Sequence, residues 1–476
     1  MQYTIEAKSG GTYDVIVAGG GTAGVIAAIA AARRGARTLI LERSFVLGGM
    51  LTAGEAGITK FSEHCRDAEV YRREVLDVLS RDPRSVQVAG GIAHEYVERL
   101  LASGNALGTG GDAGSYVFTD RWQAEWTLLE MVRESGAEVL YDTRVCLVKK
   151  AGSAVTGVVA LNKDGFTEFS AKCVIDATGD ADVAQLSGCE TRLGACEADI
   201  AEGCGSQVGE MAVFGVMFRV AGVDFARLYD YLEQNPERFW QHEFGVMSLP
   251  YARSAHEAGE MSVMRVVIDL PEGKTGLMQV YNLPEEGGAI LLGPYCDYAG
   301  NGLDARSLSL GQESLRFGAR RLLETVRCVP GFEAARITYI PDVGVRETRH
   351  VVGRYVLTGM DVLTGRDFPD SIAAGGHPVD IHPIPPEVEH MPMNHWRFHI
   401  PYRILLPKGV DNLLVAGRAV SATRMASGST RTTVQCMAMG EAAGTAAAMA
   451  VRQGCPVGDV NTDELREELK KTGAIL

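Results

Sequence analysis

The sequence feature that most constrains the fold is a glycine-rich turn between a buried strand and a helix near the N-terminus. Residues 13–18 are largely apolar and β-branched, as is typical of a buried parallel strand. Three glycines follow in the spacing G-x-G-x-x-G: Gly19, Gly21 and Gly24. Residues 25–32, which are small, apolar and free of proline, predict a helix, and residues 38–41 predict a second strand. This order of elements predicts a Rossmann-like unit.

Each glycine in this turn has a physical role. The first allows a tight turn, the second lets a pyrophosphate approach the backbone, and the third lets the helix and the strand touch. The N-terminus of the helix adds unpaired N–H groups and a partial positive charge that favour phosphate. Glu42, at the end of the second strand, lies close to the expected position of an acid, about 20 residues after the last glycine of the turn. Its carboxylate can accept both hydroxyls of a ribose. We therefore expect an adenine dinucleotide here.

The composition limits the partners and the compartment. The formal net charge of −14 over 476 residues disfavours nucleic acid and anionic membranes, since both require a basic face. Residues 434–451 form an Ala/Gly-rich run that carries Gln435 and Glu441, so they predict a buried helix rather than a membrane span. The first ten residues lack the pattern of a signal peptide, and the ten cysteines form no C-x-x-C. We expect a cytoplasmic protein with reduced thiols.

Local signals continue along the N-terminal half. Asp120 predicts an N-cap, and the following helix has an apolar stripe made of Trp122, Trp126, Leu129 and Val132. Residues 155–161 and 166–170 flank an Asn-Lys-Asp-Gly turn, which predicts a hairpin. Residues 173–177 predict a further strand, followed by small residues at its carboxyl end.

The C-terminal segment favours a flavin over a nicotinamide. No second G-x-G-x-x-G occurs, so a single dinucleotide is expected. A strand at residues 412–416 leads into Gly417 and then a Ser/Thr-rich turn, which a lone NAD domain does not need. A helix that starts at Thr432 and Thr433 would direct its positive end at the N1–C2=O edge of an isoalloxazine ring. The predicted cofactor is therefore FAD.

The periodicity changes between residues 187 and 401, where strand-like runs mix with helices. We therefore predict an α/β fold, with a doubly wound Rossmann-like FAD-binding domain and an inserted α+β substrate domain. The predicted boundaries are 12–60, 116–186 and 402–452 for the FAD-binding domain, 187–401 for the substrate or cap domain with an excursion at 61–115, and 453–476 for a C-terminal helical tail.

Several strings resemble FAD-dependent oxidoreductases of the glutathione-reductase-like superfamily, namely residues 13–24, Glu42, Gly48–Gly49, 176–179 (DATG) and 412–418 (NLLVAGR). Four more resemble the bacterial FAD-dependent oxidoreductase family, whose relatives include heterodisulfide-reductase flavin subunits and fumarate-reductase-type flavoproteins: 344–349 (GVRETR), 353–357 (GRYVL), 368–372 (FPDSI) and 400–403 (IPYR). The match covers both ends of the chain and residues 343–450. Iron–sulfur cysteine motifs, which heterodisulfide-reductase subunits carry, do not occur.

This resemblance implies a set of FAD contacts. The implied pyrophosphate contacts are Gly19, Gly21, Thr22, Ala23 and Gly24, and those to the adenosine are Glu42, Arg43 and the Val145 backbone. The residues implied near the ribityl chain and ring are Gly48, Gly49, Met50, Thr52, Gly417, Thr432 and Thr433, and those at the nucleotide end are Ala177, Thr178 and Gly179. Arg418 stands where the superfamily often has an acid that contacts the ribityl chain.

Candidates for the chemistry cluster before the last strand. Residues 350–403 hold six of the ten histidines: His350, His377, His382, His390, His395 and His399. Histidine suits proton transfer near neutral pH, and we favour His382 and His399 as catalytic residues, with Arg349 and Tyr402 beside them. Arg346, Arg349 and Arg431 are candidates to clamp a carboxylate or another oxygen-rich substrate; the alternative is salt bridging to Glu347 or Asp342. The prolines near His390 and His395 argue against a metal site.

We thus expect two-electron hydride oxidation or reduction of a small polar organic molecule through flavin N5. An external electron acceptor or donor would complete the catalytic cycle. The sequence is compatible with either a monomer or a homo-oligomer. The alternatives are a flavin electron-transfer subunit of a larger redox complex and a flavin-dependent RNA-modifying protein, the second disfavoured by the acidic charge.

Overall fold

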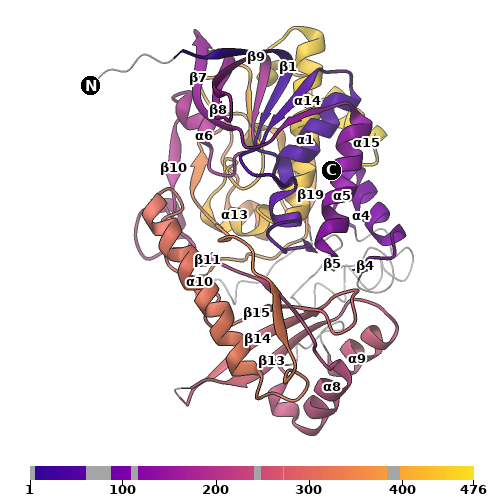
Figure 1. The fold of residues 1–476 in the computed structure, drawn as a ribbon. Helices are drawn as coiled ribbons and strands as arrows, with labels where there is room; N and C mark the ends of the chain where they lie inside the picture. The colour runs from indigo at the N-terminus through magenta and orange to yellow at the C-terminus, as the bar shows by residue number, and fades with distance from the viewer. Residues whose placement is uncertain (1–5, 60–86, 109–115, 241–247, 272, 383–396) are drawn as a thin grey trace.

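The computed structural model describes residues 6–59, 87–108, 116–240, 248–271, 273–382 and 397–476. A seven-stranded sheet forms its upper part in Figure 1, in the order β6-β2-β1-β9-β8-β7, with β21 also paired to β9. The strands are β1 (Lys8–Ala18), β2 (Thr38–Leu41), β6 (Glu138–Leu140), β7 (Arg144–Ala151), β8 (Ala154–Asn162), β9 (Gly165–Asp176) and β21 (Leu413–Val415).

The pairing within this sheet confirms the α/β Rossmann-like class. β6, β2, β1, β9 and β21 are parallel to one another, whereas β8 is antiparallel to β9 and β7 is antiparallel to β8. β8 pairs with the first half of β9 and β21 pairs with its second half. The carboxyl ends of β1, β9 and β21 therefore meet at one edge, where ligands of open α/β sheets bind.

Alternate residues of the parallel strands pack on opposite faces. Val15, Val17 and Ile40 belong to one core cluster with helices α1 (Thr22–Arg33), α4 (Gly91–Ala102), α5 (Arg121–Ser135), α14 (Thr433–Gln453) and α15 (Thr462–Lys471). Ile16 and Leu39 belong to a second cluster with β7, β8 and helix α6 (Asp182–Leu186). Both faces of the parallel strands are thus covered.

Helix α14 lies against α1 at close range because of two glycines. A Cβ on Gly440 would lie 2.2 Å from the Ala23 carbonyl oxygen, and one on Gly444 would lie 2.0 Å from that of Ala27. Any larger residue would push the helices apart. This contact fixes the C-terminal helix beside the first βα unit (Figure 1).

A second, antiparallel sheet forms the lower part of Figure 1, in the order β13-β14-β15-β12-β17. Its strands are β12 (Phe218–Ala221), β13 (Val263–Asp269), β14 (Thr275–Asn282), β15 (Ala289–Leu292) and β17 (Arg336–Tyr339), and it shares one core with α8 (Phe225–Gln234), α9 (Leu249–Glu257) and α10 (Ala305–Val326). This sheet lies within the predicted insertion. We propose the domain boundaries given above as the division of the chain.

Short elements complete the described chain. The strands are β3 (Ile58–Thr59), β4 (Ala106–Gly108), β5 (Tyr116–Thr119), β10 (Thr191–Leu193), β11 (Phe214–Gly215), β16 (Asp297–Tyr298), β18 (Arg349–Val351), β19 (Ser371–Gly375) and β20 (Phe398–Pro401). The helices are η1 (Gly49–Leu51), α7 (Glu197–Ala201), η4 (Pro236–Arg238), α11 (Gly359–Leu363), η6 (Tyr402–Leu405), α13 (Arg424–Thr430) and η7 (Val457–Asp459). No helix within the described ranges is long and apolar enough to cross a membrane.

Two local features differ from the sequence pattern. Residues 166–170 and 173–176 belong to the single strand β9, because parallel pairing with β1 continues along both. On α5 the Asp120 cap is confirmed, but Trp122 and Trp126 are 54% and 55% exposed. The buried face of α5 carries smaller residues such as Ala124 and Leu128, which pack against α1 and α4.

A buried ion pair joins the antiparallel sheet to the segment between η1 and β3. Arg219 of β12 donates to the Glu55 carboxylate at 2.9 Å and to Glu285 at 2.7 Å, and the side chains of Arg219 and Glu55 are buried. Burial raises the pKa of Glu55, against the opposing effect of the Arg219 charge. Removing the cation alone would leave a buried carboxylate without its partner.

We expect Arg219→Met to lower the free energy of unfolding by about 3–5 kcal/mol, as for other broken buried pairs. The double variant Arg219→Met/Glu55→Gln should recover most of this loss, since no buried charge remains. Urea denaturation at pH 7 measures both values. Arg238→Met, which removes an exposed pair with Asp269, is the control and should cost less than about 1 kcal/mol. A double variant as unstable as the single one would contradict the assignment.

Candidate functional site

Two glycines of the first turn are required by the fold itself. Gly19 has φ of 97°, and a Cβ there would lie 2.5 Å from the Ala177 carbonyl oxygen at the end of β9. A Cβ on Gly24 would lie 1.8 Å from the Gly19 carbonyl oxygen. The turn and the close approach of helix α1 to the strands therefore both depend on glycine.

Gly21 differs from these two glycines. Its φ is −69°, and a Cβ would meet no atom within 4 Å. Every other described glycine whose Cβ would meet open space has a positive φ. The folded chain therefore does not need glycine at position 21, whereas a ligand lying along the backbone would. This open position fits the pyrophosphate of a dinucleotide.

The Gly48–Gly49 pair lies beside this turn. The backbone N–H of Gly48 donates to the Gly20 carbonyl at 2.8 Å, and the Thr22 hydroxyl donates to the Gly48 carbonyl at 3.0 Å. A Cβ on Gly49 would lie 3.2 Å from the Gly21 Cα. Met50 follows and is partly exposed, while the Thr52 hydroxyl donates to the Leu47 carbonyl.

Glu42 is buried at the end of β2 and lies over the turn. Its Oε2 accepts from the Gly20 N–H at 2.6 Å and its Oε1 accepts from the Ser44 N–H at 2.7 Å. Each carboxylate oxygen has two lone pairs, so both retain capacity to accept a ribose hydroxyl. Arg43 is exposed, and Val145 is buried in β7.

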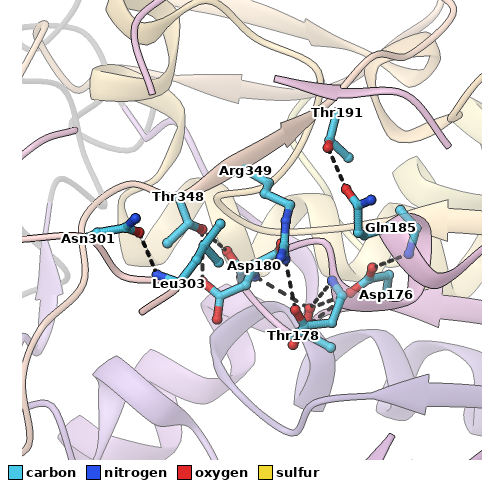
Figure 2. Close-up of polar contacts among 12 residues, drawn as sticks. Asp176, Thr178, Asp180, Gln185, Thr191, Asn301, Leu303, Thr348 and Arg349 are labelled. Carbon is cyan, nitrogen blue, oxygen red and sulfur yellow. Dashed lines mark hydrogen bonds and ion pairs between the residues drawn. The ribbon is translucent and has the colours of Figure 1, made fainter. Parts of the chain in front are cut away.

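The turn after β9 is held by its own side chains (Figure 2). Asp176 accepts from the Thr178 hydroxyl at 2.7 Å and from the Ala184 N–H at 2.9 Å. Burial raises the pKa of Asp176 to about 6. Gly179 follows with φ of 83°. Ala177 donates its N–H to the Ala18 carbonyl, which keeps this turn beside the end of β1.

Arg349 and Arg418 both contact this second turn. Arg349 donates to the Asp180 carbonyl and to the Asp182 carboxylate, each at 3.0 Å (Figure 2). Arg418 donates to the Asp180 carboxylate at 2.6 Å and to the Val345 carbonyl. Both guanidinium groups are thus hydrogen-bonded to the turn that follows β9.

The start of α14 comes close to the same region. A Cβ on Gly417, at the end of β21, would lie 3.3 Å from the Ala23 Cβ. Thr432 is the N-cap of α14, and its hydroxyl donates to the Gln435 side chain. The Gln435 amide nitrogen is buried and has no hydrogen-bond partner among the described residues. Helix α14 then continues from Thr433 along α1.

A small cavity lies next to the cradle, which consists of the glycine turn, the turn after β9 and the start of α14. It is lined by Ala212, Arg346, Glu347, Asp380, Ile381, Arg424, Ser427, Gly428 and Arg431. A Cβ on Gly344, two residues before Arg346, would lie 4.0 Å from the Met50 Cε, so the segment that leads into Arg346 passes beside Met50. A larger cavity lies at the opposite end of α1, away from the glycine turn, between α4 and α15.

His382 is linked to this cavity through Asp380. The His382 Nε2 lies 2.8 Å from Asp380 Oδ1, and Arg431 donates to the Asp380 carbonyl at 2.8 Å and to its Oδ2 at 3.1 Å. Burial acts to raise the pKa of Asp380, but the hydrogen bond from His382 and the Arg431 charge hold this pKa well below its usual range. Burial lowers the pKa of Arg431. An ionised Asp380 therefore orients His382.

The other catalytic candidates lie elsewhere. His399 is on β20, where burial lowers its pKa, and its Nδ1 is 4.0 Å from Asp367. Tyr402 is buried, and its hydroxyl donates to the Val457 carbonyl at 2.8 Å. Neither residue lines the cavity. Tyr402 therefore makes a structural hydrogen bond to the C-terminal segment.

The remaining histidines that the structure describes in this segment, His350 and His377, contact other groups than Asp380. His350 is buried, and its Nε2 lies 3.6 Å from Glu347. His377 Nδ1 lies 2.6 Å from the Pro378 carbonyl. His390 and His395 lie outside the described residues. Among those that are described, no group of three or more His, Cys, Asp or Glu side chains is arranged to hold a metal ion.

The structure brings together His382, Arg346 and Arg431, but it pairs Arg349 with a different turn. Sequence reasoning missed Asp380 and Arg424. The D-x-H spacing of Asp380 and His382 was an available signal for the first. Arg424 had none, because its significance depends on burial among distant residues.

Two curated proteins are similar to part of this chain. The chain is 28% identical over 167 residues to a digeranylgeranylglycerophospholipid reductase of Picrophilus torridus, covering 35% of this chain and 39% of the relative. It is 32% identical over 169 residues to another of Methanopyrus kandleri, covering 35% and 37%. The chain thus matches less than half the length of these curated relatives.

Two solved structures align over most of the chain. A geranylgeranyl bacteriochlorophyll reductase-like protein of Thermoplasma acidophilum has 13% identity and a TM-score of 0.43, covering 98% of this chain and 85% of that one. The p-nitrophenol 4-monooxygenase PnpA of Pseudomonas putida has 13% identity and a TM-score of 0.43, covering 97% and 85%.

The family model described as FAD dependent oxidoreductase matches residues 14–469. This match includes the glycine turn, the turn after β9 and the start of α14, which together form the cradle. Because it spans nearly the whole chain, the protein belongs to the FAD dependent oxidoreductase family and is an oxidoreductase that uses FAD.

Proposed function

We propose that the protein oxidises or reduces a small polar organic molecule by two electrons beside His382 and Asp380. The observation that carries this proposal is that His382 is held by Asp380, whose carboxylate lines a cavity together with three arginines. FAD, when bound, supplies a site at N5 of its ring that accepts or gives up a hydride.

The proposal includes a set of residues that hold FAD across the cradle. The turn around Gly21 would lie along the pyrophosphate, and Glu42 would accept the ribose hydroxyls. The positive end of the α14 dipole would lie near the pyrimidine edge of the ring. The proposed cofactor contacts remain Gly19, Gly21, Thr22, Ala23, Gly24, Glu42, Arg43, Gly48, Gly49, Met50, Thr52, Val145, Ala177, Thr178, Gly179, Gly417, Arg418, Thr432 and Thr433.

His382 would move the proton that accompanies the hydride. Its Nε2 is held by Asp380, so Nδ1 is the nitrogen that can exchange a proton with a substrate. When a C–H bond next to a hydroxyl or amine loses its hydride, the O–H or N–H proton passes to His382. In the reductive direction His382 returns that proton. Such positioned acid–base groups contribute roughly 10²–10⁴-fold to a rate.

The second half-reaction would use an external electron acceptor or donor. We further propose a place for the protein among the glutathione-reductase-like flavoproteins, near the heterodisulfide-reductase and fumarate-reductase types, on the strength of the string DATG and the segments at residues 344–372.

Anaerobic addition of hydroxy acids, amines, sugars and enoates to the purified holoenzyme tests the reaction. We expect at least one class to bleach the flavin absorbance at about 450 nm, or to reoxidise a flavin that has first been reduced with dithionite. If no class changes the flavin, and only a protein electron carrier does, the proposed reaction is wrong.

A further inference from the structure

We infer that the outer face of helix α5 binds the same face of a second copy of this chain, so that the protein forms a dimer with twofold symmetry. This face, the α5 stripe, consists of Trp122, Trp126, Leu129 and Arg133. It shares no residue with the cofactor cradle or with the cavity, so the inference is independent of the proposed function. It accounts for two tryptophans that the fold of a single chain leaves exposed.

The apolar residues of the α5 stripe are accessible to water in the single chain. Trp122 is 54% exposed, Trp126 is 55% exposed and Leu129 is 36% exposed. The opposite face of α5, which includes Leu128 and Met131, is the face that packs in the core with α1 and α4. Since a whole tryptophan side chain presents up to about 250 Å², the two rings together leave roughly 270 Å² uncovered. Grouped aromatic side chains of this kind are typical of a protein–protein interface.

The spacing of the α5 stripe indicates which partner fits it. Its residues follow one another at intervals of four, three and four positions, which is the spacing of a seam between two helices packed side by side. These intervals are the same in both directions along the helix. A second α5 that runs antiparallel therefore places its Leu129 opposite Trp126 and its Arg133 opposite Trp122. Such a pair is isologous, so it closes after two chains.

The two ends of the α5 stripe complement each other in the antiparallel orientation. Arg133 is exposed, and its guanidinium makes no hydrogen bond or ion pair with any residue that the structure describes. In the dimer this cation lies over Trp122 of the second copy, and tryptophan is the ring that attracts cations most strongly. Trp122 already has the Arg121 guanidinium of its own chain 5.3 Å from its ring centre, and the ring is still half exposed. A parallel pair would instead bring the two Arg133 cations together.

Charged side chains flank the α5 stripe. Glu130 is exposed beside it, and Glu134 forms an ion pair with Arg99 of α4 at 2.6 Å. An apolar centre with a charged rim is the usual anatomy of an interface between proteins. A single helix is narrower than the roughly 800 Å² per partner of a standard interface. We therefore expect a dimer that dissociates on dilution.

Sedimentation equilibrium of the FAD-loaded protein from about 1 to 100 µM tests the dimer, because small interfaces dissociate in the micromolar range. We expect a monomer–dimer equilibrium. Trp126→Glu, which places a charge at the centre of the α5 stripe, should weaken dimerisation at least about 30-fold, as for other central tryptophans of interfaces. Phe317→Glu is the matched control: Phe317 is a 68% exposed aromatic residue on a different helix, α10, and this variant should dimerise as the parent does. Circular dichroism and the melting curve check that each variant is folded.

A charge exchange tests the antiparallel register. Trp122→Lys would place a cation opposite Arg133 of the second copy and should weaken dimerisation at least about 10-fold. The double variant Trp122→Lys/Arg133→Glu pairs opposite charges at the same two positions and should bind about 3-fold or more tighter than Trp122→Lys alone.

A protein that stays monomeric over the whole concentration range would overturn the inference. A dimer that Trp126→Glu leaves intact, or one that Phe317→Glu disrupts instead, would also overturn it. Monomeric protein that binds neutral phosphatidylcholine vesicles and loses this binding with Trp126→Glu would show that the α5 stripe covers lipid rather than a second copy. A dimer that depends on Trp126 but is not strengthened by the charge exchange would contradict the pairing of Trp122 with Arg133.

Discussion

Replacing Gly21 with aspartate is expected to abolish FAD binding while the protein stays folded. The Cβ position at Gly21 meets open space, and Gly21 is the N-cap of α1, where aspartate is a favoured residue. The new carboxylate would lie where the pyrophosphate is proposed to bind. Two like charges about 4 Å apart cost roughly 4 kcal/mol at an effective dielectric constant of 20, which is a loss of about 10³-fold in affinity.

The ratio of flavin absorbance to protein absorbance measures this loss, and circular dichroism with the melting curve measures the fold. Gly24→Asp is the contrasting variant: its Cβ would lie 1.8 Å from the Gly19 carbonyl oxygen, so the fold itself should fail. Ser309→Asp, on the exposed surface of α10, controls for the added charge and should keep its FAD. A Gly21→Asp protein that is purified with a full complement of FAD would show that the pyrophosphate lies elsewhere.

His382→Gln is expected to slow flavin reduction by the substrate about 10²–10⁴-fold without loss of FAD. The substitution keeps a similar polar shape beside Asp380 but cannot take up the proton at Nδ1. Anaerobic stopped-flow mixing with whichever compound bleaches the parent enzyme measures the rate of the reductive step directly.

His399→Gln is the matched comparison for this prediction. His399 is also a partly buried histidine of the same chain segment, but it lies on β20, where its Nδ1 is 4.0 Å from Asp367 rather than beside Asp380. We expect its rate to stay within about 10-fold of the parent. If His399→Gln slows the step as much as His382→Gln does, or if His382→Gln has no effect, the proton-transfer role of His382 is wrong.

The elements that the sequence predicted well are those defined by short-range patterns. β1, α1 and β2 follow from an apolar run, a glycine turn and a proline-free helix, and the structure places them as expected. The long helix near the C-terminus follows from its alanine-rich composition. The continuity of β9 did not follow, because it depends on pairing with β1 along its whole length rather than on local residues.

In the candidate site, too, local patterns predicted some residues, whereas others depend on contacts between distant parts of the chain. The glycine turn and Glu42 were predictable because their spacing follows from the geometry of one βα unit. His382 was one of six histidines in its segment, and only the tertiary contact with Asp380 and Arg431 distinguishes it. Arg349 looked equally suitable for a substrate clamp, yet it is paired with Asp182. Arg424 could not be singled out from the sequence, because the acids that it contacts, Glu210 and Glu347, are more than 70 positions away in the chain.

The central claim is that distant segments of the chain form one cradle for a single FAD. Hydrogen–deuterium exchange of the apoprotein and of the FAD-loaded protein tests it most directly. We predict that FAD protects amides in three segments together: around Gly21, around Gly49, and at Thr432–Thr433 at the start of α14. Protection confined to the turn around Gly21, with no change at Thr432–Thr433, would contradict the claim.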